Sequence, residues 1–127
     1  MEKGLLKQNG VHLQEHEYKT VKLFLEKGID VELIPQSRIT KLRQPDIMMG
    51  GVAWEIKAPM GTGKNNIENT LQGASGQSRN IIVDLSRSKM YEEEAIKGYG
   101  QYFKNSKRIK RLKIIKKNRE IVDFYKR

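Results

Sequence analysis

The chain has 127 residues, a length that fits a single domain, residues 1–127, with one modest core. Its net charge is +10, so we expect an anionic partner, for which nucleic acid and a membrane surface are the usual candidates. Cysteine is absent, which excludes disulfides, thiol catalysis and cysteine-metal sites, and no apolar run is long enough for a transmembrane helix.

The first expected element is a helix over residues 12–27, whose apolar residues share one stripe. Glu17 lies on that stripe, four residues from both Leu13 and Val21. A carboxylate at the edge of a core needs a partner, and a metal ion or Lys57 would supply one. The alternative is that Glu17 reaches water or a nearby lysine at the border of the stripe.

The other expected elements follow from periodicity and turn residues. Strands are expected over 31–35, 46–49, 52–58, 80–85, 109–116 and 120–125, and further helices over 66–78 and 92–103. The order is therefore α-β-β-β-α-β-α-β-β. Because strand 80–85 is apolar throughout and is reached through a helical crossover, we expect an α/β fold, a mixed sheet flanked by helices on both faces.

The strongest functional signal lies in the hairpin that turns at Gly50-Gly51. Side chains alternate along a strand, so Glu55 and Lys57 share one face, and the turn would bring Asp46 alongside that face. Two carboxylates and one ammonium are the groups that a divalent-metal site for phosphodiester hydrolysis uses, with Mg²⁺ or Mn²⁺ bound through oxygen. The spacing is that of a compact PD-(D/E)xK nuclease motif. The alternative is a solvated ion pair contributing ~0–1 kcal/mol.

Residues near the second helix extend this candidate site. Gln77, close to the end of helix 66–78, would lie towards the charged side of the sheet, where it would position water or substrate; the alternative is an ordinary surface glutamine. Gly73 and Gly76 weaken that helix by ~1 kcal/mol each relative to alanine, which suggests a close approach to another group. The loop with Lys64 lacks the full phosphate-loop pattern, so nucleoside triphosphate binding is not expected.

Basic residues gather over residues 104–127 and again just before the Pro-Asp pair at 45–46. Two such clusters on either side of the carboxylates would hold a phosphate backbone. The candidate nucleic-acid contacts are Arg38, Lys41, Arg43, Lys64, Arg79 and Arg87. The alternative is a solubilising surface with no specific ligand.

The stretch from Pro45-Asp46 to Asp84-Leu85 resembles the C-terminal tRNase and nuclease toxin domains of CdiA contact-dependent growth inhibition proteins. The matching features are the Pro-Asp strand, the glycine turn, the Trp-Glu-Ile-Lys segment at 54–57, the helix to Gln77 and the Ile-Ile-Val-Asp strand. The resemblance implies a restriction-endonuclease-like fold and an endonuclease that cleaves tRNA, with some relatives acting on DNA. It also implies metal-binding roles for Asp46 and Glu55, a catalytic role for Lys57 and an accessory acidic role for Glu17.

The resemblance and the charge together suggest partners: nucleic acid, with tRNA favoured over DNA, and an acidic immunity or antitoxin protein as a further candidate. We expect action in the cytoplasm. Because the chain begins at its own methionine with no large secretion segment ahead of it, the delivery route is not predicted. A membrane-surface role is not expected, because no long helix combines a strong apolar face with a basic one.

Two other functions remain open at this stage. The first is a metal-independent ribonuclease, in which the 2′-OH of the RNA attacks the adjacent phosphodiester. Its catalytic side chains would be Lys57, Lys64, Thr70 and Arg79. The second is a non-catalytic RNA- or DNA-binding module in which Glu55 and Lys57 merely pair. Cleavage that survives EDTA would favour the first, and binding without cleavage would favour the second.

Overall fold

The computed structural model describes residues 2–36, 44–63 and 65–126. Over these residues the chain is a mixed α/β fold with one seven-stranded sheet, three α-helices and a short 3-10 helix. In chain order the elements are β1 (Leu6–Lys7), α1 (Glu15–Glu26), β2 (Val31–Leu33), β3 (Ile47–Met49), β4 (Val52–Lys57), α2 (Asn66–Ser75), β5 (Asn80–Asp84), η1 (Leu85–Arg87), α3 (Glu92–Asn105), β6 (Arg111–Ile115) and β7 (Ile121–Tyr125).

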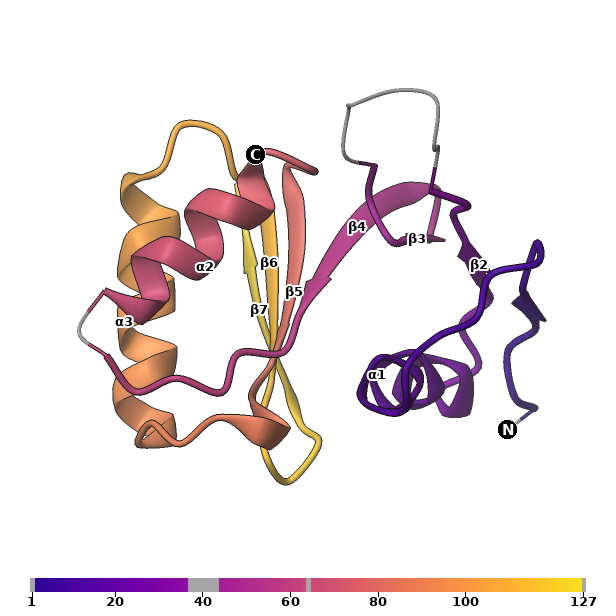
Figure 1. Ribbon diagram of the computed structural model, residues 1–127, viewed down its shortest axis with the longest axis horizontal. Helices are drawn as coiled ribbons and strands as arrows, with labels where there is room; N and C mark the ends of the chain where they lie inside the picture. The colour runs from indigo at the N-terminus through magenta and orange to yellow at the C-terminus, as the bar shows by residue number, and fades with distance from the viewer. Residues whose placement is uncertain (1, 37–43, 64, 127) are drawn as a thin grey trace.

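The strands lie in the sheet in the same order as in the sequence, from β1 to β7. Strands β2, β3 and β4 pair antiparallel, β4, β5 and β6 pair parallel, and β7 returns antiparallel to β6. The two central parallel pairings follow from the connections, because α2 joins β4 to β5 and α3 joins β5 to β6 (Figure 1).

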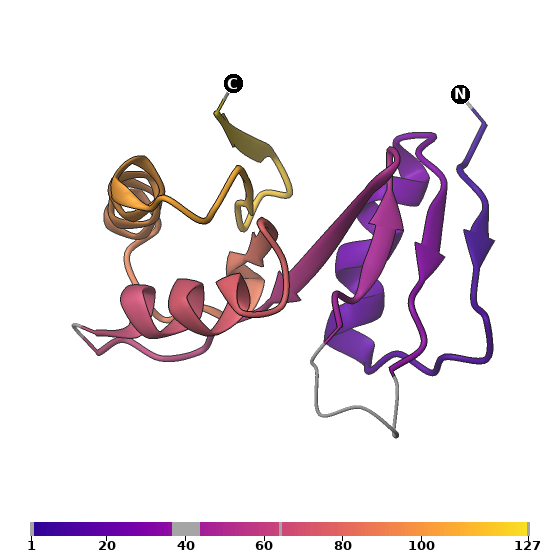
Figure 2. The same ribbon diagram turned by 90° about the horizontal axis from the view of Figure 1, so that it is seen from above.

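Helices cover both faces of the sheet, and each face has its own hydrophobic core. Helix α1 packs through Val21 and Phe24 against a cluster that includes Ile82, and α2 and α3 pack on the opposite face against a cluster that includes Ile81. Figure 2 shows α1 beside β2 to β4, with α2 and α3 beside the other half of the sheet. Strand β5 is therefore buried on both faces, as its continuous apolar sequence predicted.

All the predicted helices and strands are present, and the differences lie at their ends. Strand β1 was not predicted, because two residues carry no readable alternation. Helix α1 begins at Glu15, because Gln14 and Glu17 form a capping box at its start. Helix α2 ends at Ser75 and not at residue 78, because Ser78 Oγ donates to the carbonyl of Ala53 and so belongs to the sheet.

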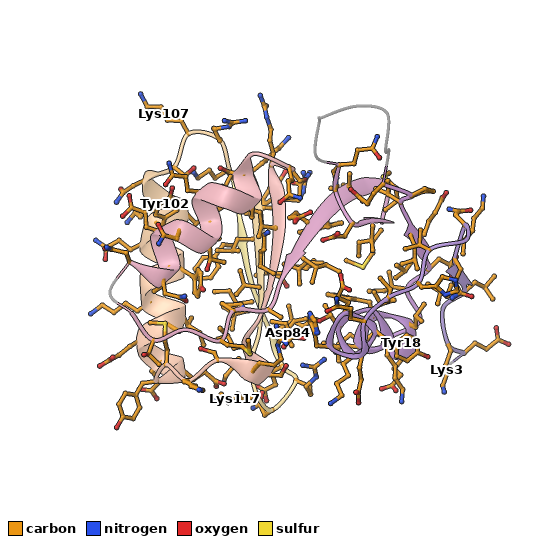
Figure 3. All side chains as sticks on the ribbon, in the orientation of Figure 1. Lys3, Tyr18, Asp84, Tyr102, Lys107 and Lys117 are labelled. Carbon is orange, nitrogen blue, oxygen red and sulfur yellow. The ribbon has the colours of Figure 1, made fainter. Side chains whose placement is uncertain are left out.

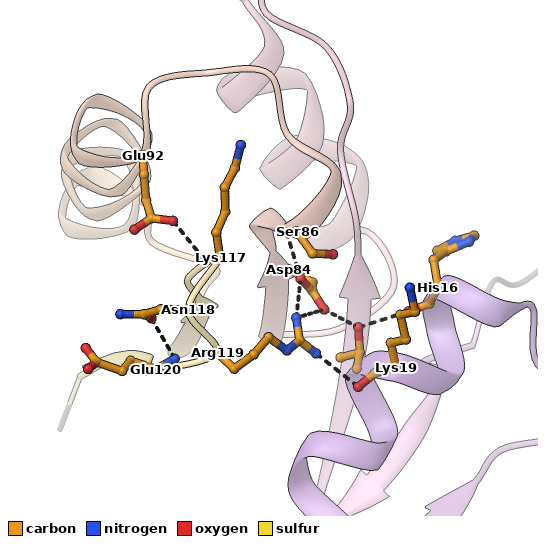
Figure 4. Close-up of polar contacts among 10 residues, drawn as sticks. His16, Lys19, Asp84, Ser86, Glu92, Lys117, Asn118, Arg119 and Glu120 are labelled. Carbon is orange, nitrogen blue, oxygen red and sulfur yellow. Dashed lines mark hydrogen bonds and ion pairs between the residues drawn. The ribbon is translucent and has the colours of Figure 1, made fainter.

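A buried polar cluster joins α1 to the sheet and to the turn between β6 and β7 (Figure 4). Asp84, at the end of β5, accepts hydrogen bonds from Thr20 Oγ1 at 2.6 Å and from the Ser86 amide at 2.9 Å. Arg119 Nη1 lies 3.0 Å and 3.1 Å from the two oxygens of Asp84, and its Nη2 donates to the carbonyl of Lys19. In Figure 3, Asp84 lies between α1 and the strands. The cluster fixes α1, and with it Glu17, relative to the sheet.

None of the helices in the described part of the chain combines the length and the apolar character needed to cross a membrane.

Candidate active site

The β3–β4 hairpin places Asp46 beside Glu55. Gly50 and Gly51 adopt φ values of 61° and 73°, which glycine reaches without strain, and they form the two-residue turn that the sequence predicted. The register pairs Ile47 with Trp54, and the Asp46 amide donates to the Trp54 carbonyl at 2.9 Å. Just past the end of this ladder, Asp46 Oδ2 accepts a hydrogen bond of 2.8 Å from the Ile56 amide.

Glu55 and Lys57 share the face of β4 that looks towards α2, as strand alternation predicted. Their register partners, Ile81 and Val83, belong to the core under α2 and α3, whereas Trp54 packs in the core under α1. Lys57 Nζ lies 3.5 Å from Glu55 Oε2. The Glu55 side chain is only 3% exposed, and that of Lys57 is 32% exposed. The pair is therefore mostly buried and does not match the solvated ion pair that was the alternative.

Burial disfavours the charged forms of both carboxylates, and the charge of Asp46 adds to this effect at Glu55. Burial raises the pKa of Glu55 to about 8, the adjacent charge of Asp46 adds to the effect, and Lys57 offsets part of it. Burial likewise raises the pKa of Asp46, although the hydrogen bond from the Ile56 amide opposes the shift. Glu55 Oε1 is buried and has no hydrogen-bond partner in the described structure. The two side chains thus form an acidic pair in which Lys57 offsets only part of the free-energy cost of ionising Glu55.

Glu17 lies in the first turn of α1, where its Oε1 accepts a 3.0 Å hydrogen bond from the Gln14 amide. Its negative charge also contributes to raising the pKa of Asp46, so the two carboxylates are near enough to interact. Within residues 2–36, 44–63 and 65–126, however, no three His, Asp or Glu side chains are grouped closely enough to hold a metal ion. Asp46 and Glu55 are brought together, and Glu17 stays outside their immediate contact.

A pocket of about 320 Å³ opens beside the acidic pair. It is lined by Lys57, Ala58, Pro59, Asn69, Thr70 and Gly73. Arg87 Nη2 donates a 2.9 Å hydrogen bond to the Ala58 carbonyl, so this guanidinium borders the site and holds the end of β4. Asn69 was not predicted as a site residue. Its spacing of four from Gly73 puts both on one face of a helix, but nothing in the sequence indicates which face meets Lys57.

Comparison with known proteins identifies the family. The model of the contact-dependent growth inhibition CdiA C-terminal domain matches residues 43–121, more than half of the chain. The chain belongs to this family. It is therefore a CdiA C-terminal domain of contact-dependent growth inhibition, the family that the resemblance predicted. The matched region contains Asp46, Glu55 and Lys57, and Glu17 precedes it.

A solved CdiA-CT/CdiI toxin and immunity complex from Burkholderia pseudomallei has a similar structure, with a TM-score of 0.71 and 21% sequence identity. The similarity extends over 97% of this chain and 100% of that one, so the two share a fold. A comparison with curated proteins gave no match.

The remaining predicted residues of this CdiA C-terminal domain occupy different places. Arg79 is exposed, and its carbonyl accepts from the amides of Lys110 and Arg111 at the start of β6. Gln77 is half-buried with its Oε1 lacking a hydrogen-bond partner among the described residues, and it precedes Ser78, which contacts Ala53. The predicted contacts Arg38, Lys41, Arg43 and Lys64 lie outside the described residues.

Proposed function

We propose that this CdiA C-terminal domain is a metal-dependent endonuclease that hydrolyses phosphodiester bonds, with tRNA favoured over DNA as its substrate. The observation that carries the proposal is the buried Glu55 carboxylate, which lies beside Asp46 and 3.5 Å from Lys57 Nζ in a chain of net charge +10. This arrangement corresponds to a PD-(D/E)xK motif of the restriction-endonuclease-like kind.

The donor set suits a hard divalent cation. Mg²⁺ is commonly bound through one or two carboxylates together with waters and substrate phosphate, so two carboxylates are a sufficient protein contribution. The unpartnered Oε1 of Glu55 and the repulsion between Glu55 and Asp46 are the features that a cation would relieve. When bound, Mg²⁺ or Mn²⁺ would supply positive charge that favours deprotonation of water and offsets the charge on the phosphate. Glu17 would act from the outer shell of this site.

Lys57 is the proposed catalytic cation. It lines the pocket beside the acidic pair while its Nζ stays within reach of Glu55. From there it would orient the attacking water or offset negative charge that develops on the phosphate in the transition state. Gln77 would help to position water or substrate, and Arg79 and Arg87 would contact the phosphate backbone.

The partner proposals rest on charge and on family membership. A net charge of +10 favours a polyanionic substrate. The similar structure from Burkholderia pseudomallei is described as a complex of toxin and immunity protein, so we propose that an acidic immunity protein neutralises this chain as well. The proposed place of action is the cytoplasm, where tRNA is found.

The test is a cleavage assay with total tRNA and with plasmid DNA, each with Mg²⁺, with Mn²⁺ and with EDTA. We expect cleavage of tRNA that requires the metal ion and that disappears in Asp46→Ala. A matched control is Asp123→Ala, which removes an exposed β7 carboxylate paired with Lys113 and should leave cleavage unchanged.

One alternative activity has a specific observation in its favour. Lys57 and Thr70, two of the side chains considered for a metal-independent ribonuclease, line the same pocket. Cleavage that persists in EDTA with a cyclic-phosphate product would replace the metal-dependent proposal with this one. Tight, salt-sensitive binding without cleavage under any condition would leave a nucleic-acid-binding module.

A further inference from the structure

Gly73 lies inside helix α2 at a position where the described structure gives no reason for glycine. Its φ is not in the left-handed region, and a Cβ built there would meet nothing within 4 Å. Glycine is the poorest helix former after proline, so the residue weakens α2. The close approach that this glycine suggested in the sequence is therefore not made by any described part of the chain.

The glycines of α3 show the contrast. A Cβ on Gly98 would collide with Ile67 Cδ1, and a Cβ on Gly100 would lie 2.9 Å from the ring of Phe124. Both are explained by tight packing between elements of the same protein. Gly73 also lies inside a helix, but it is exposed, so tight packing does not explain why it is glycine.

The surroundings of Gly73 indicate what could approach it. It lines the pocket of about 320 Å³ together with Lys57, Asn69 and Thr70, which carry polar side chains, and with Ala58 and Pro59. A cation with amide and hydroxyl donors suits phosphate and sugar oxygens. The volume of this pocket is at the lower end of the range for ligand-binding clefts. The pocket therefore suits one unit of a nucleic-acid strand and not a folded protein.

We propose that the exposed face of α2 at Gly73 is the surface on which the sugar-phosphate backbone of the substrate strand lies as it leaves the acidic pair. Gly73 is glycine because any side chain there would occupy the space of that strand. This inference rests on the proposed nuclease function and adds the path of the substrate to it.

The experiment measures binding separately from cleavage. Gly73→Leu and Gly73→Glu are compared with Gln72→Leu and Gln72→Glu, which make the same changes at an exposed α2 position outside the pocket. Binding of total tRNA is measured by fluorescence anisotropy in an Asp46→Ala background, so that the RNA stays intact, and melting temperature is measured for every variant.

We expect Gly73→Leu to weaken tRNA binding by ~10-fold or more, and Gly73→Glu to weaken it further because its charge repels phosphate. The melting temperature should stay the same or rise, since either residue is a better helix former than glycine. The Gln72→Leu variant should bind like its parent, and Gln72→Glu should lose less affinity than Gly73→Glu.

Unchanged affinity in Gly73→Leu, with Asp46→Ala as the parent, would overturn the inference. So would equal losses at positions 72 and 73, because the effect would then be general to the helix surface. These results are independent of catalysis: a chain that binds tRNA through Gly73 and never cleaves it would contradict only the proposed nuclease function. A chain that binds no tRNA would overturn the inference and would contradict tRNA as the proposed substrate, whereas cleavage of plasmid DNA would still support the nuclease function.

Discussion

At the scale of single residues, Glu55 is a carboxylate in an unfavourable environment. It is 3% exposed, it borders Asp46, and one of its oxygens has no described hydrogen-bond partner. Lys57 at 3.5 Å compensates only part of the cost. Titratable groups with strongly shifted pKa values gather at functional sites, because catalysis requires the environments that a stable core avoids. Glu55 therefore costs stability in the metal-free protein.

This cost predicts a pH dependence for the metal-free chain. In the unfolded chain the Glu55 carboxyl ionises near 4.5, whereas burial raises its pKa to about 8 in the folded protein. The folded state thus holds a proton that the unfolded state has lost, so the free energy of unfolding falls as pH rises through that window. Glu55→Gln should remove the effect and stabilise the protein at the upper end of the window by ~1–3 kcal/mol.

Urea denaturation in EDTA at both ends of the window measures this difference. The matched control is Glu68→Gln on the exposed surface of α2, which should shift the free energy of unfolding equally at both pH values. A Glu55→Gln variant that is no more stable than the parent at high pH would show that Glu55 ionises without penalty.

Lys57 provides the second prediction at this scale. Lys57→Ala should lower kcat for tRNA cleavage by ~10²-fold or more, the usual cost of removing one group that stabilises transition-state charge. The fold should persist, because the side chain is 32% exposed and not part of either hydrophobic core. Steady-state kinetics and circular dichroism measure the two effects. Lys97→Ala, an exposed α3 position, is the control, and near-parent kcat in Lys57→Ala would end the catalytic assignment.

At the scale of the elements, the docking of α1 depends on the polar cluster around Asp84. Burial alone would raise the pKa of Asp84, but hydrogen bonds from Thr20 and Ser86 together with the Arg119 charge lower it below its usual value. Arg119 reaches the cluster from a turn where its own φ is 71°, an uncommon conformation for a side-chain-bearing residue. The contacts that hold this turn and α1 together are thus made by residues about one hundred positions apart, Arg119 and Lys19.

Breaking this cluster should loosen the contact between α1 and the sheet. Arg119→Ala leaves the 1% exposed Asp84 without its charged partner, so we expect a loss of ~2–4 kcal/mol in the free energy of unfolding. Because Glu17 lies on α1, cleavage should also weaken under conditions where the variant is still folded. Urea denaturation and tRNA cleavage are the measurements. Lys117→Ala, exposed in the same turn, should change stability by no more than ~0.5 kcal/mol.

At the scale of the whole molecule, the excess of positive charge is the dominant property. The net charge is +10, and exposed lysines and arginines follow the turn between α3 and β6, where Lys107 projects outwards (Figure 3). Such a surface attracts a polyanion and gives its binding a strong dependence on salt. Lys57 lines the pocket beside α2, whereas these other cations would act through the charge of the surface.

Salt dependence tests this property directly. For a duplex region, each neutralised phosphate lowers log K by ~0.9 per tenfold rise in salt, so four contacts predict a ~100-fold loss of affinity between about 50 and 200 mM NaCl. We expect tRNA binding by the Asp46→Ala variant to fall at least that steeply. A shallow dependence would indicate that the basic surface serves solubility and that binding depends on few ionic contacts.

The sequence by itself determined the elements and the face of the hairpin on which the candidate residues lie. Alternation along β4 and a two-residue glycine turn are local properties, so Asp46, Glu55 and Lys57 could be placed together without any knowledge of the rest of the fold. Periodicity likewise predicted α1, α2 and α3 and the buried strand β5, and its errors were confined to element ends and to β1.

Only the tertiary structure decided how buried the Glu55 carboxylate is, that Arg119 pairs with Asp84, and that Gly73 opens into the pocket of Lys57. Each of these depends on elements distant in the sequence meeting in space. The pKa of about 8 for Glu55 depends on the residues packed around it. The open space at Gly73 depends on the positions of all its described neighbours. Local sequence specifies which groups share a face, whereas long-range packing sets the burial and charge that determine what those groups can do.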